Sequence, residues 1–190
     1  VKSPEEIAII KEAGQIVASA LATLVSKVKP GVVTADLDRV VTREFREKGA
    51  TPSFKGYRGY PASLCVSVND QVVHGIPGKR VLQEGDVVSL DLGAIYKGFQ
   101  GDAAVTVGVG TVSRQARELI DVTSEGLAIG IMAAVVGARL GDISWAVQSF
   151  VESHGYSVVR EYAGHGIGRA MHEEPQVPNF GMPGRGPLLR

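Results

Sequence analysis

Two stretches of this chain follow the same pattern 106 residues apart, and this repeat constrains the fold more than any other feature. In each, a glycine turn leads to an aspartate at the start of an amphipathic segment that ends at a second glycine. Two similarly capped helices could also match in this way by chance. Taken as a true repeat, the pattern predicts an α+β fold with pseudo-two-fold symmetry, with a sheet inside and helices on one side. The matched pairs are Gly31 with Gly137, Asp36 with Asp142, Leu37 with Ile143, Val41 with Val147, Phe45 with Val151 and Gly49 with Gly155.

Capping residues and apolar periodicity predict four helices. Ser3-Pro4-Glu5-Glu6 combines an N-cap, a proline at the first helical position and a capping-box glutamate. Asp142 is expected to cap the fourth helix. The third helix, capped by Ser113, carries an apolar face of Leu119, Val122, Leu127 and Ile131. The predicted elements are helices from Pro4 toward Pro30, from about Thr34 to Gly49, after Ser113 and from Asp142 to Gly155, with strands at 64–68, 71–74, 87–107 (a hairpin) and 156–162.

The hairpin carries two aspartates whose relative placement depends on its turn. Two runs of β-type residues flank Lys97-Gly98. With an even number of loop residues, Asp91 faces Ala104 and Asp102 faces Gly93, so both carboxylates project from one face of the sheet. Like charges side by side repel, and a divalent cation between them resolves the repulsion. An odd loop would separate the carboxylates, and a surface hairpin with two solvated aspartates stays open as an alternative.

Three of the four histidines are candidates for chemistry. His165 lies in a glycine run directly after a predicted strand, where the backbone can approach a ligand closely, although a lone loop histidine is the more usual explanation. His172 follows in Met171-His172-Glu173-Glu174-Pro175, and His74 ends a predicted strand. Two aspartates and one histidine form a mixed N/O ligand set suited to Mn, Fe, Co or Zn.

Composition excludes several other classes. Lysine plus arginine and aspartate plus glutamate both number 20, so no basic surface suggests nucleic acid or an anionic membrane as the main partner. The single cysteine, Cys65, permits no internal disulfide, and a reducing cytoplasm is the expected location. The N-terminus is amphipathic and charged, unlike a signal peptide.

Several blocks, taken together and in order, resemble the bacterial-type (type I) methionine aminopeptidases. The resemblance spans the whole chain and implies the pita-bread fold, in which helices pack on a curved, mostly antiparallel sheet around two divalent metal ions. One domain over 1–190 is expected, with half-repeats at about 1–110 and 111–190. The blocks are Phe54-Lys55-Gly56-Tyr57-Arg58-Gly59-Tyr60-Pro61, Cys65-Val66-Ser67-Val68-Asn69, Val73-His74-Gly75-Ile76-Pro77, the Asp91/Asp102 hairpin, Gly164-His165-Gly166-Ile167-Gly168-Arg169 and His172-Glu173-Glu174-Pro175-Gln176.

The resemblance also implies roles for individual residues. Asp91, Asp102 and His165 correspond to metal ligands, Asp102 bridging both ions. His74 and His172 correspond to catalytic histidines that contact the substrate and the reaction intermediate. The walls of the pocket for the methionine side chain correspond to Phe54, Tyr57, Tyr60, Cys65 and Met171.

In one respect the sequence departs from the family. Two glutamate ligands that the family supplies from later strands have no counterpart before Arg190, and Glu173 and Glu174 are poor substitutes. The second half-repeat is therefore expected to be incomplete and the chain to be truncated at its C-terminus. The truncated chain by itself is expected to be a poor or inactive enzyme.

The expected activity is removal of the initiator methionine from nascent chains by a monomer, which makes the ribosome a candidate partner. Two alternatives stay open: another pita-bread peptidase, of the prolidase or aminopeptidase P type, and a non-catalytic pita-bread module that binds peptides or proteins. The missing glutamates are the feature that favours the non-catalytic module.

Overall fold

The computed structural model describes residues 2–190, and its chain falls into two compact units. Unit 1 contains the chain up to Ser113 together with Ile167–His172, and unit 2 contains Arg114–Gly166 and Glu173–Arg190. The grouping of all residues into one domain with half-repeats at 1–110 and 111–190 stays a prediction.

Unit 1 is built on an antiparallel sheet of four strands whose centre is β3 (Val87–Tyr96). The β4 strand (Phe99–Gly108) pairs along the whole length of β3. On the other edge of β3 lie β1 (Thr51–Pro52) and β2 (Cys65–Val68). The predicted hairpin and the predicted strand at 64–68 are thus confirmed.

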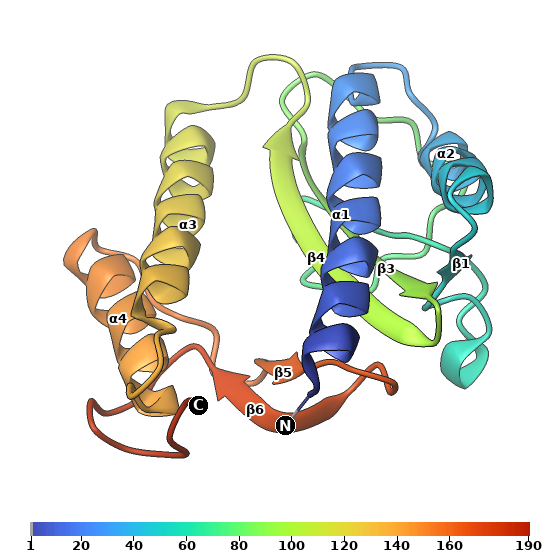
Figure 1. Cartoon of the computed structure of the whole chain (residues 1–190). Helices are drawn as coiled ribbons and strands as arrows, with labels where there is room; N and C mark the ends of the chain where they lie inside the picture. Colours follow the sequence, from blue (N-terminus) through green and yellow to red (C-terminus); the bar gives the residue numbers. More distant parts are fainter. Residues whose placement is uncertain (1) are drawn as a thin grey trace. The chain divides into compact units, whose positions relative to one another are not determined.

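One face of this sheet is covered by two helices, α1 (Pro4–Lys27) and α2 (Thr34–Glu47). Figure 1 shows α1 lying along the β3–β4 hairpin. The predicted capping box is present, since the Ser3 hydroxyl accepts from the Glu6 N–H and the Glu6 carboxylate accepts from the Ser3 N–H. The core between the layers contains Val17, Leu24, Leu37, Val41, Phe45, Val88, Leu90 and Leu92, all nearly or fully buried.

Helix α1 is long and apolar enough to cross a membrane on length and composition alone. Its buried residues, however, form one stripe that packs on the sheet, and the remaining positions are a mixture of polar and apolar residues, most of them exposed. This arrangement is that of a core helix in a globular unit.

Unit 2 contains α3 (Arg114–Ala133), α4 (Leu140–Ser153) and the antiparallel pair β5 (Ala163–Gly166) and β6 (Glu173–Pro178). The two helices approach closely where α3 carries glycine. A Cβ on Gly126 would lie 3.1 Å from Val151 Cγ2, and a Cβ on Gly130 would lie 2.7 Å from Val147 Cγ2. A side chain at either position would crowd α4, so these glycines allow the two helices to pack closely.

The 106-residue repeat is borne out at the level of local structure. Helices α2 and α4 have bounds offset by that same number at both ends. Gly31 and Gly137 adopt φ values of 89° and 90°, and Gly49 and Gly155 follow the two helices with φ of 67° and 81°. Such left-handed positions favour glycine, which explains why glycine occurs at both.

Several local predictions are wrong. Residues 71–74 and 156–162 are not strands, and the strand predicted at 156–162 begins only at Ala163. Val72 and Val73 have high β propensity, but both are exposed in a loop. Propensity alone therefore does not make this segment a strand. Asp142 is not an N-cap but the third residue of α4, where its carboxylate accepts from the N–H groups of Arg139 and Gly184.

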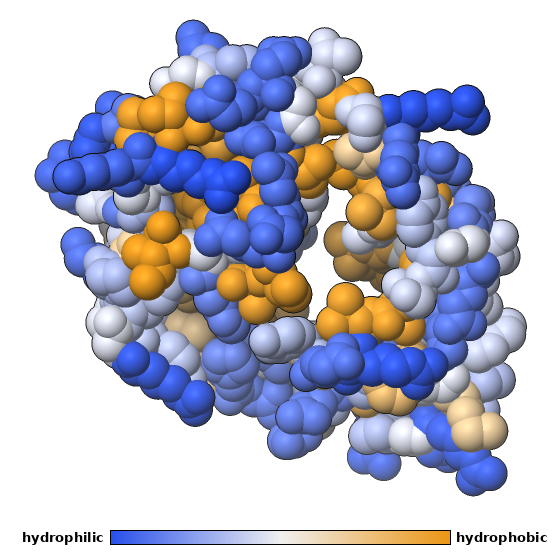
Figure 2. All heavy atoms as spheres, turned by 180° about the vertical axis from the view of Figure 1, so that it is seen from behind, coloured by the Kyte–Doolittle hydropathy of each residue, from blue (hydrophilic) through white to orange (hydrophobic). Residues whose placement is uncertain are grey.

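The apolar face predicted for α3 is mostly exposed. Val122 is buried, whereas Leu119, Leu127 and Ile131 are 47%, 60% and 64% exposed. Within residues 2–190, the side of α3 that packs on α4 is the one carrying Gly126 and Gly130. On the face drawn in Figure 2, apolar side chains occur at the surface among polar ones.

Candidate functional site

The turn between β3 and β4 decides where the two aspartates point. Lys97 and Gly98 have φ values of 48° and 80°, the two positive values of a two-residue hairpin turn, and Tyr96 pairs with Phe99. Asp91 therefore faces Ala104, and Asp102 faces Gly93. Since side chains alternate along each strand, both carboxylates project from the same face of the sheet, as the sequence predicts.

That face is the one turned away from the two helices. Val88, Leu90 and Leu92 alternate with Asp91 along β3 and are fully buried in the helix-covered core. On the aspartate face the neighbours are polar or small. Ser89 and Thr106 face each other with their hydroxyls 2.8 Å apart, and Cys65 lies opposite Asp91 on β2.

Gly93 makes room for an aromatic ring beside the aspartates. A Cβ at this position would lie 3.0 Å from Phe54 Cε1 and 2.9 Å from Ser53 Cβ, closer than ordinary contact. Ser53 is held there by its N–H, which donates to the Gly93 carbonyl over 2.8 Å. The absence of a side chain at Gly93 thus admits the segment that carries Phe54.

An apolar cluster of Phe54, Cys65 and Met171 forms next to the aspartate pair, with the partly buried Tyr60 packed against it. Burial raises the pKa of the Cys65 thiol to about 11; the Tyr60 hydroxyl opposes this shift, and the Asp91 and Asp102 charges add to it. Burial also raises the pKa of the Tyr60 hydroxyl. That hydroxyl donates to the carbonyls of Leu64 and Gly75. Four of the five predicted pocket residues are thus brought together.

The fifth, Tyr57, contacts His172. It begins the short 3₁₀ turn η1 (Tyr57–Gly59), and its hydroxyl lies 3.3 Å from His172 Nδ1. The two rings stack with their centroids 5.8 Å apart, and the Arg58 guanidinium lies over the Tyr57 ring, 5.4 Å from its centroid. The orientation of His172 is therefore set by an aromatic neighbour as well as by its own loop.

The other two histidines lie elsewhere. His74 is exposed in a loop rather than at a strand end, with a left-handed φ of 60°. Its neighbour Gly75 is tied to β2, since the Val66 N–H donates to the Gly75 carbonyl and the Gly75 N–H donates to the Ser67 hydroxyl. His165 lies within β5 of unit 2, not after a strand, and its Nδ1 is 3.0 Å from the Gly166 carbonyl.

The donor set fits a divalent cation at the aspartate pair. Both carboxylates are partly accessible, share one face of the β3–β4 hairpin and act electrostatically on the same Cys65 thiol. Carboxylate oxygens are the ligands such ions prefer. Among residues 2–190, no group of three or more histidine, cysteine, aspartate or glutamate side chains is placed together for a metal. The structure therefore places two carboxylates, those of Asp91 and Asp102, together as candidate metal ligands.

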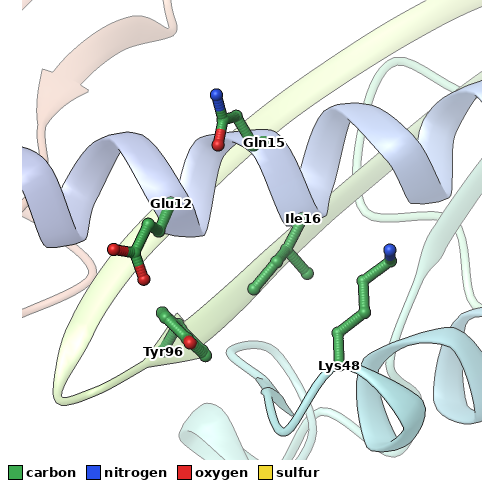
Figure 3. A pocket seen from close by; sticks show the side chains of 5 residues that line it. All are labelled: Glu12, Gln15, Ile16, Lys48 and Tyr96. Atoms are coloured by element: carbon green, nitrogen blue, oxygen red, sulfur yellow. The ribbon is translucent and has the colours of Figure 1, made fainter.

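An open hollow elsewhere in unit 1 belongs to the opposite side of the sheet. It is lined by Glu12, Gln15, Ile16, Lys48 and Tyr96 (Figure 3). Because Tyr96 shares the face of β3 that packs on α1, this hollow has no access to the aspartate pair.

Sequence reasoning missed the buried polar pair Ser53 and Gln100. The Ser53 hydroxyl donates to Gln100 Oε1 over 2.6 Å, and these residues are 7% and 6% exposed. Strand alternation carried a usable signal, since Gln100 is two residues before Asp102 and so shares its face.

Residues 8–190 match the model of metallopeptidase family M24, and the chain belongs to this family. It is 54% identical over 190 residues to a methionine aminopeptidase of Clostridium acetobutylicum, covering 100% of this chain and 76% of that protein.

Solved structures are also similar. A methionine aminopeptidase from Thermotoga maritima superposes with a TM-score of 0.98 at 48% identity, covering 100% of this chain and 77% of that one. A prolidase from Pyrococcus furiosus, 23% identical with a TM-score of 0.85, covers 100% of this chain and 54% of that chain and shows the shared fold alone. The predicted pita-bread fold and family are thereby confirmed, and the chain is a metal-dependent hydrolase.

Proposed function

We propose that this chain removes the N-terminal methionine from peptides and nascent proteins. The observation that carries the proposal is the extent of the similarity, 54% identity along the whole chain to a methionine aminopeptidase. The local chemistry agrees, because two carboxylates share one face of a sheet beside an apolar cluster of aromatic and sulfur-containing side chains. The non-catalytic alternative is not favoured.

Asp91, Asp102 and His165 are the proposed metal ligands. The two aspartates are held by adjacent strands, and His165 precedes by two residues the segment Ile167–His172 of unit 1. Divalent ions in metallopeptidases supply a nucleophile from water and polarise the scissile carbonyl. Membership of the family implies such ions. We further propose that the site holds two of them and that they are Co, Mn, Fe or Zn.

The methionine side chain is proposed to enter the cluster formed by Phe54, Cys65, Met171 and Tyr60. Its aromatic and sulfur groups suit a flexible thioether, which makes favourable contacts with ring edges. The raised pKa of Cys65 keeps that thiol neutral near pH 7, so it behaves as an apolar wall.

The two catalytic histidines are proposed to act on the substrate. The Tyr57 hydroxyl, 3.3 Å from Nδ1 of His172, helps to orient that ring. His74 is exposed on a loop tied to β2 through Gly75, so its ring can reach a peptide at the site. A histidine N–H directed at the oxygen of the scissile carbonyl stabilises the charge that develops there.

Partners and location complete the proposal. A monomer in the cytoplasm, acting on chains that emerge from the ribosome, accords with balanced charge and with one buried cysteine.

Peptide specificity tests the proposal. The purified protein, supplied with Mn²⁺ or Co²⁺, is incubated with Met-Ala-Ser and, in parallel, with an Ala-Pro dipeptide. Release of methionine that is abolished by a chelator supports the proposal. Cleavage of Ala-Pro alone would instead indicate a prolidase-type enzyme, and metal-independent binding of the peptides without hydrolysis would indicate a binding module.

A further inference from the structure

Gln100 is a buried polar side chain with partners on two separate chain segments. It is 6% exposed, and its Oε1 accepts from the Ser53 hydroxyl over 2.6 Å. Its Nε2 donates toward the Arg169 carbonyl over 3.5 Å, and its backbone N–H donates to the Gly168 carbonyl over 2.8 Å. A single residue at the start of β4 thus links the segment after β1 to the segment Ile167–His172.

Both linked segments carry pocket residues immediately beyond the point of attachment. Ser53 is followed by Phe54, and Arg169 is followed two residues later by Met171 and then by His172. Phe54 and Met171 meet in the same apolar cluster, and His172 lies against Tyr57 of the same loop as Phe54. The separation of these two pocket walls therefore depends on what holds their segments together.

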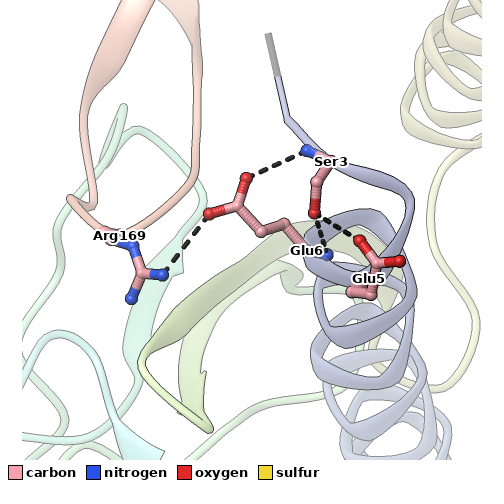
Figure 4. A network of polar contacts seen from close by, with 4 residues as sticks. All are labelled: Ser3, Glu5, Glu6 and Arg169. Carbon is pink, nitrogen blue, oxygen red and sulfur yellow. Dashed lines mark hydrogen bonds and ion pairs between the residues drawn. The ribbon is translucent and has the colours of Figure 1, made fainter.

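A second attachment of the same segment lies at the surface. The Arg169 guanidinium is 4.4 Å from the centre of the Phe99 ring and 3.4 Å from a Glu6 carboxylate oxygen (Figure 4). The Arg169 side chain is 69% exposed, so solvent and salt screen this ion pair. Gln100, by contrast, acts in a buried environment, where a lost partner is costly.

We propose that Gln100 is a positioning residue that determines the width of the methionine pocket and the placement of His172. This inference rests on the proposed aminopeptidase function. Gln100 does not touch the substrate; it holds Ile167–His172 and the Ser53–Phe54 segment at one spacing. Its loss lets Met171 withdraw from Phe54, which loosens discrimination between methionine and other apolar side chains.

Three variants test this role. Gln100→Met keeps the volume but removes both side-chain hydrogen bonds, whereas Ser53→Ala removes only the bond on the Phe54 side. Gln15→Met is the matched control, since Gln15 is exposed on α1 and lines the hollow on the helix-covered side of the sheet. Each is compared with the parent protein by amide hydrogen exchange of the peptide spanning 167–172, by metal content, and by kcat and KM for Met-Ala-Ser and Leu-Ala-Ser.

For Gln100→Met we expect exchange in 167–172 to rise by about two- to tenfold, the factor that corresponds to one lost hydrogen bond. The preference for methionine over leucine should fall by roughly tenfold, the low end of what an apolar pocket contributes. Metal content should stay unchanged. Ser53→Ala should change exchange in 167–172 less, and Gln15→Met should match the parent.

Different results overturn different claims. Unchanged exchange in 167–172, or equal losses of turnover on the two peptides, would show that Gln100 serves general stability only. If Gln100→Met does not fold, Gln100→Glu retains the acceptor for Ser53 and removes the donor to Arg169, and the same exchange measurement decides. A parent protein that folds and binds metal yet releases no methionine refutes the proposed function instead.

Discussion

Gly93 and Asp102 are direct partners across the β3–β4 pair, and the missing side chain of Gly93 is the reason that Phe54 can lie beside that pair. Asp102 supplies a carboxylate, and Gly93, its partner on the neighbouring strand, leaves room for the Phe54 ring. The charged and the apolar parts of the site are thereby placed next to each other on a single pair of strands.

Replacing Gly93 by alanine should destabilise unit 1 and disturb the pocket. The new Cβ would lie 3.0 Å from Phe54 Cε1 and 2.9 Å from Ser53 Cβ, so the ring and its backbone must shift. We expect a loss of about 1–3 kcal/mol in the free energy of unfolding, as for other overpacked sites. Gly14→Ala is the control, because a Cβ there meets nothing within 4 Å inside α1 and should stabilise by about 0.5–1 kcal/mol. Equal denaturation midpoints for the two variants would contradict the close approach.

Asp102→Asn should abolish tight binding of divalent metal. The substitution keeps the shape of the side chain but removes one of two charges from the shared face, and metal affinity depends on ligand charge. Titration calorimetry with Mn²⁺ measures the effect. Asp121→Asn, an exposed position on α3, removes the same charge elsewhere and should leave binding unchanged. Undiminished affinity in Asp102→Asn would exclude Asp102 as a ligand.

His74→Ala should lower kcat by about 10²–10³ while leaving metal content near normal, the range measured when one donor to a developing oxyanion is removed. The histidine is exposed on a loop of unit 1, so its removal leaves the core intact. Steady-state kinetics and metal analysis of the same preparation measure the two effects separately. A variant that loses its metal would show that His74 is a ligand rather than a substrate-binding group.

Asp86 should make the stability of unit 1 sensitive to acid. Burial by itself raises the pKa of this carboxyl, but hydrogen bonds from the Gln83 N–H and the Asn69 amide lower it to below its ordinary value. A carboxyl with a lowered folded-state pKa stabilises the fold above its unfolded-state pKa of about 3.9, and this contribution is lost as the pH falls through the folded-state value. Asp86→Asn should cost about 1–3 kcal/mol at pH 7.

The difference between parent and Asp86→Asn in the free energy of unfolding should shrink as the pH falls below about 4. Urea denaturation at several pH values measures it. Asp121→Asn again serves as the control, with no pH-dependent difference expected. A difference that stays constant from pH 7 to pH 3 would show that the carboxylate charge of Asp86 does not contribute.

Features that depend on neighbouring residues could be derived from the sequence. The capping box at Ser3, the glycines that end α2 and α4, and the Lys97-Gly98 turn all act over a few bonds. The type of turn determines the strand register, and the register determines the face of the sheet from which each side chain projects. The sequence alone therefore determined the repeat of helices and the shared face of Asp91 and Asp102.

Features that depend on distant partners were decided by the tertiary structure. Residues 71–74 have strand-like composition, but they are exposed and form a loop rather than a strand of the sheet. The segment Ile167–His172 joins unit 1 because Gln100 offers it hydrogen bonds and the Phe54 cluster offers Met171 an apolar surface. Both partners are far from that segment in the sequence, so local propensity cannot predict these contacts. The fold alone brings them together, because burial is favourable only where those surfaces and hydrogen-bonding groups meet.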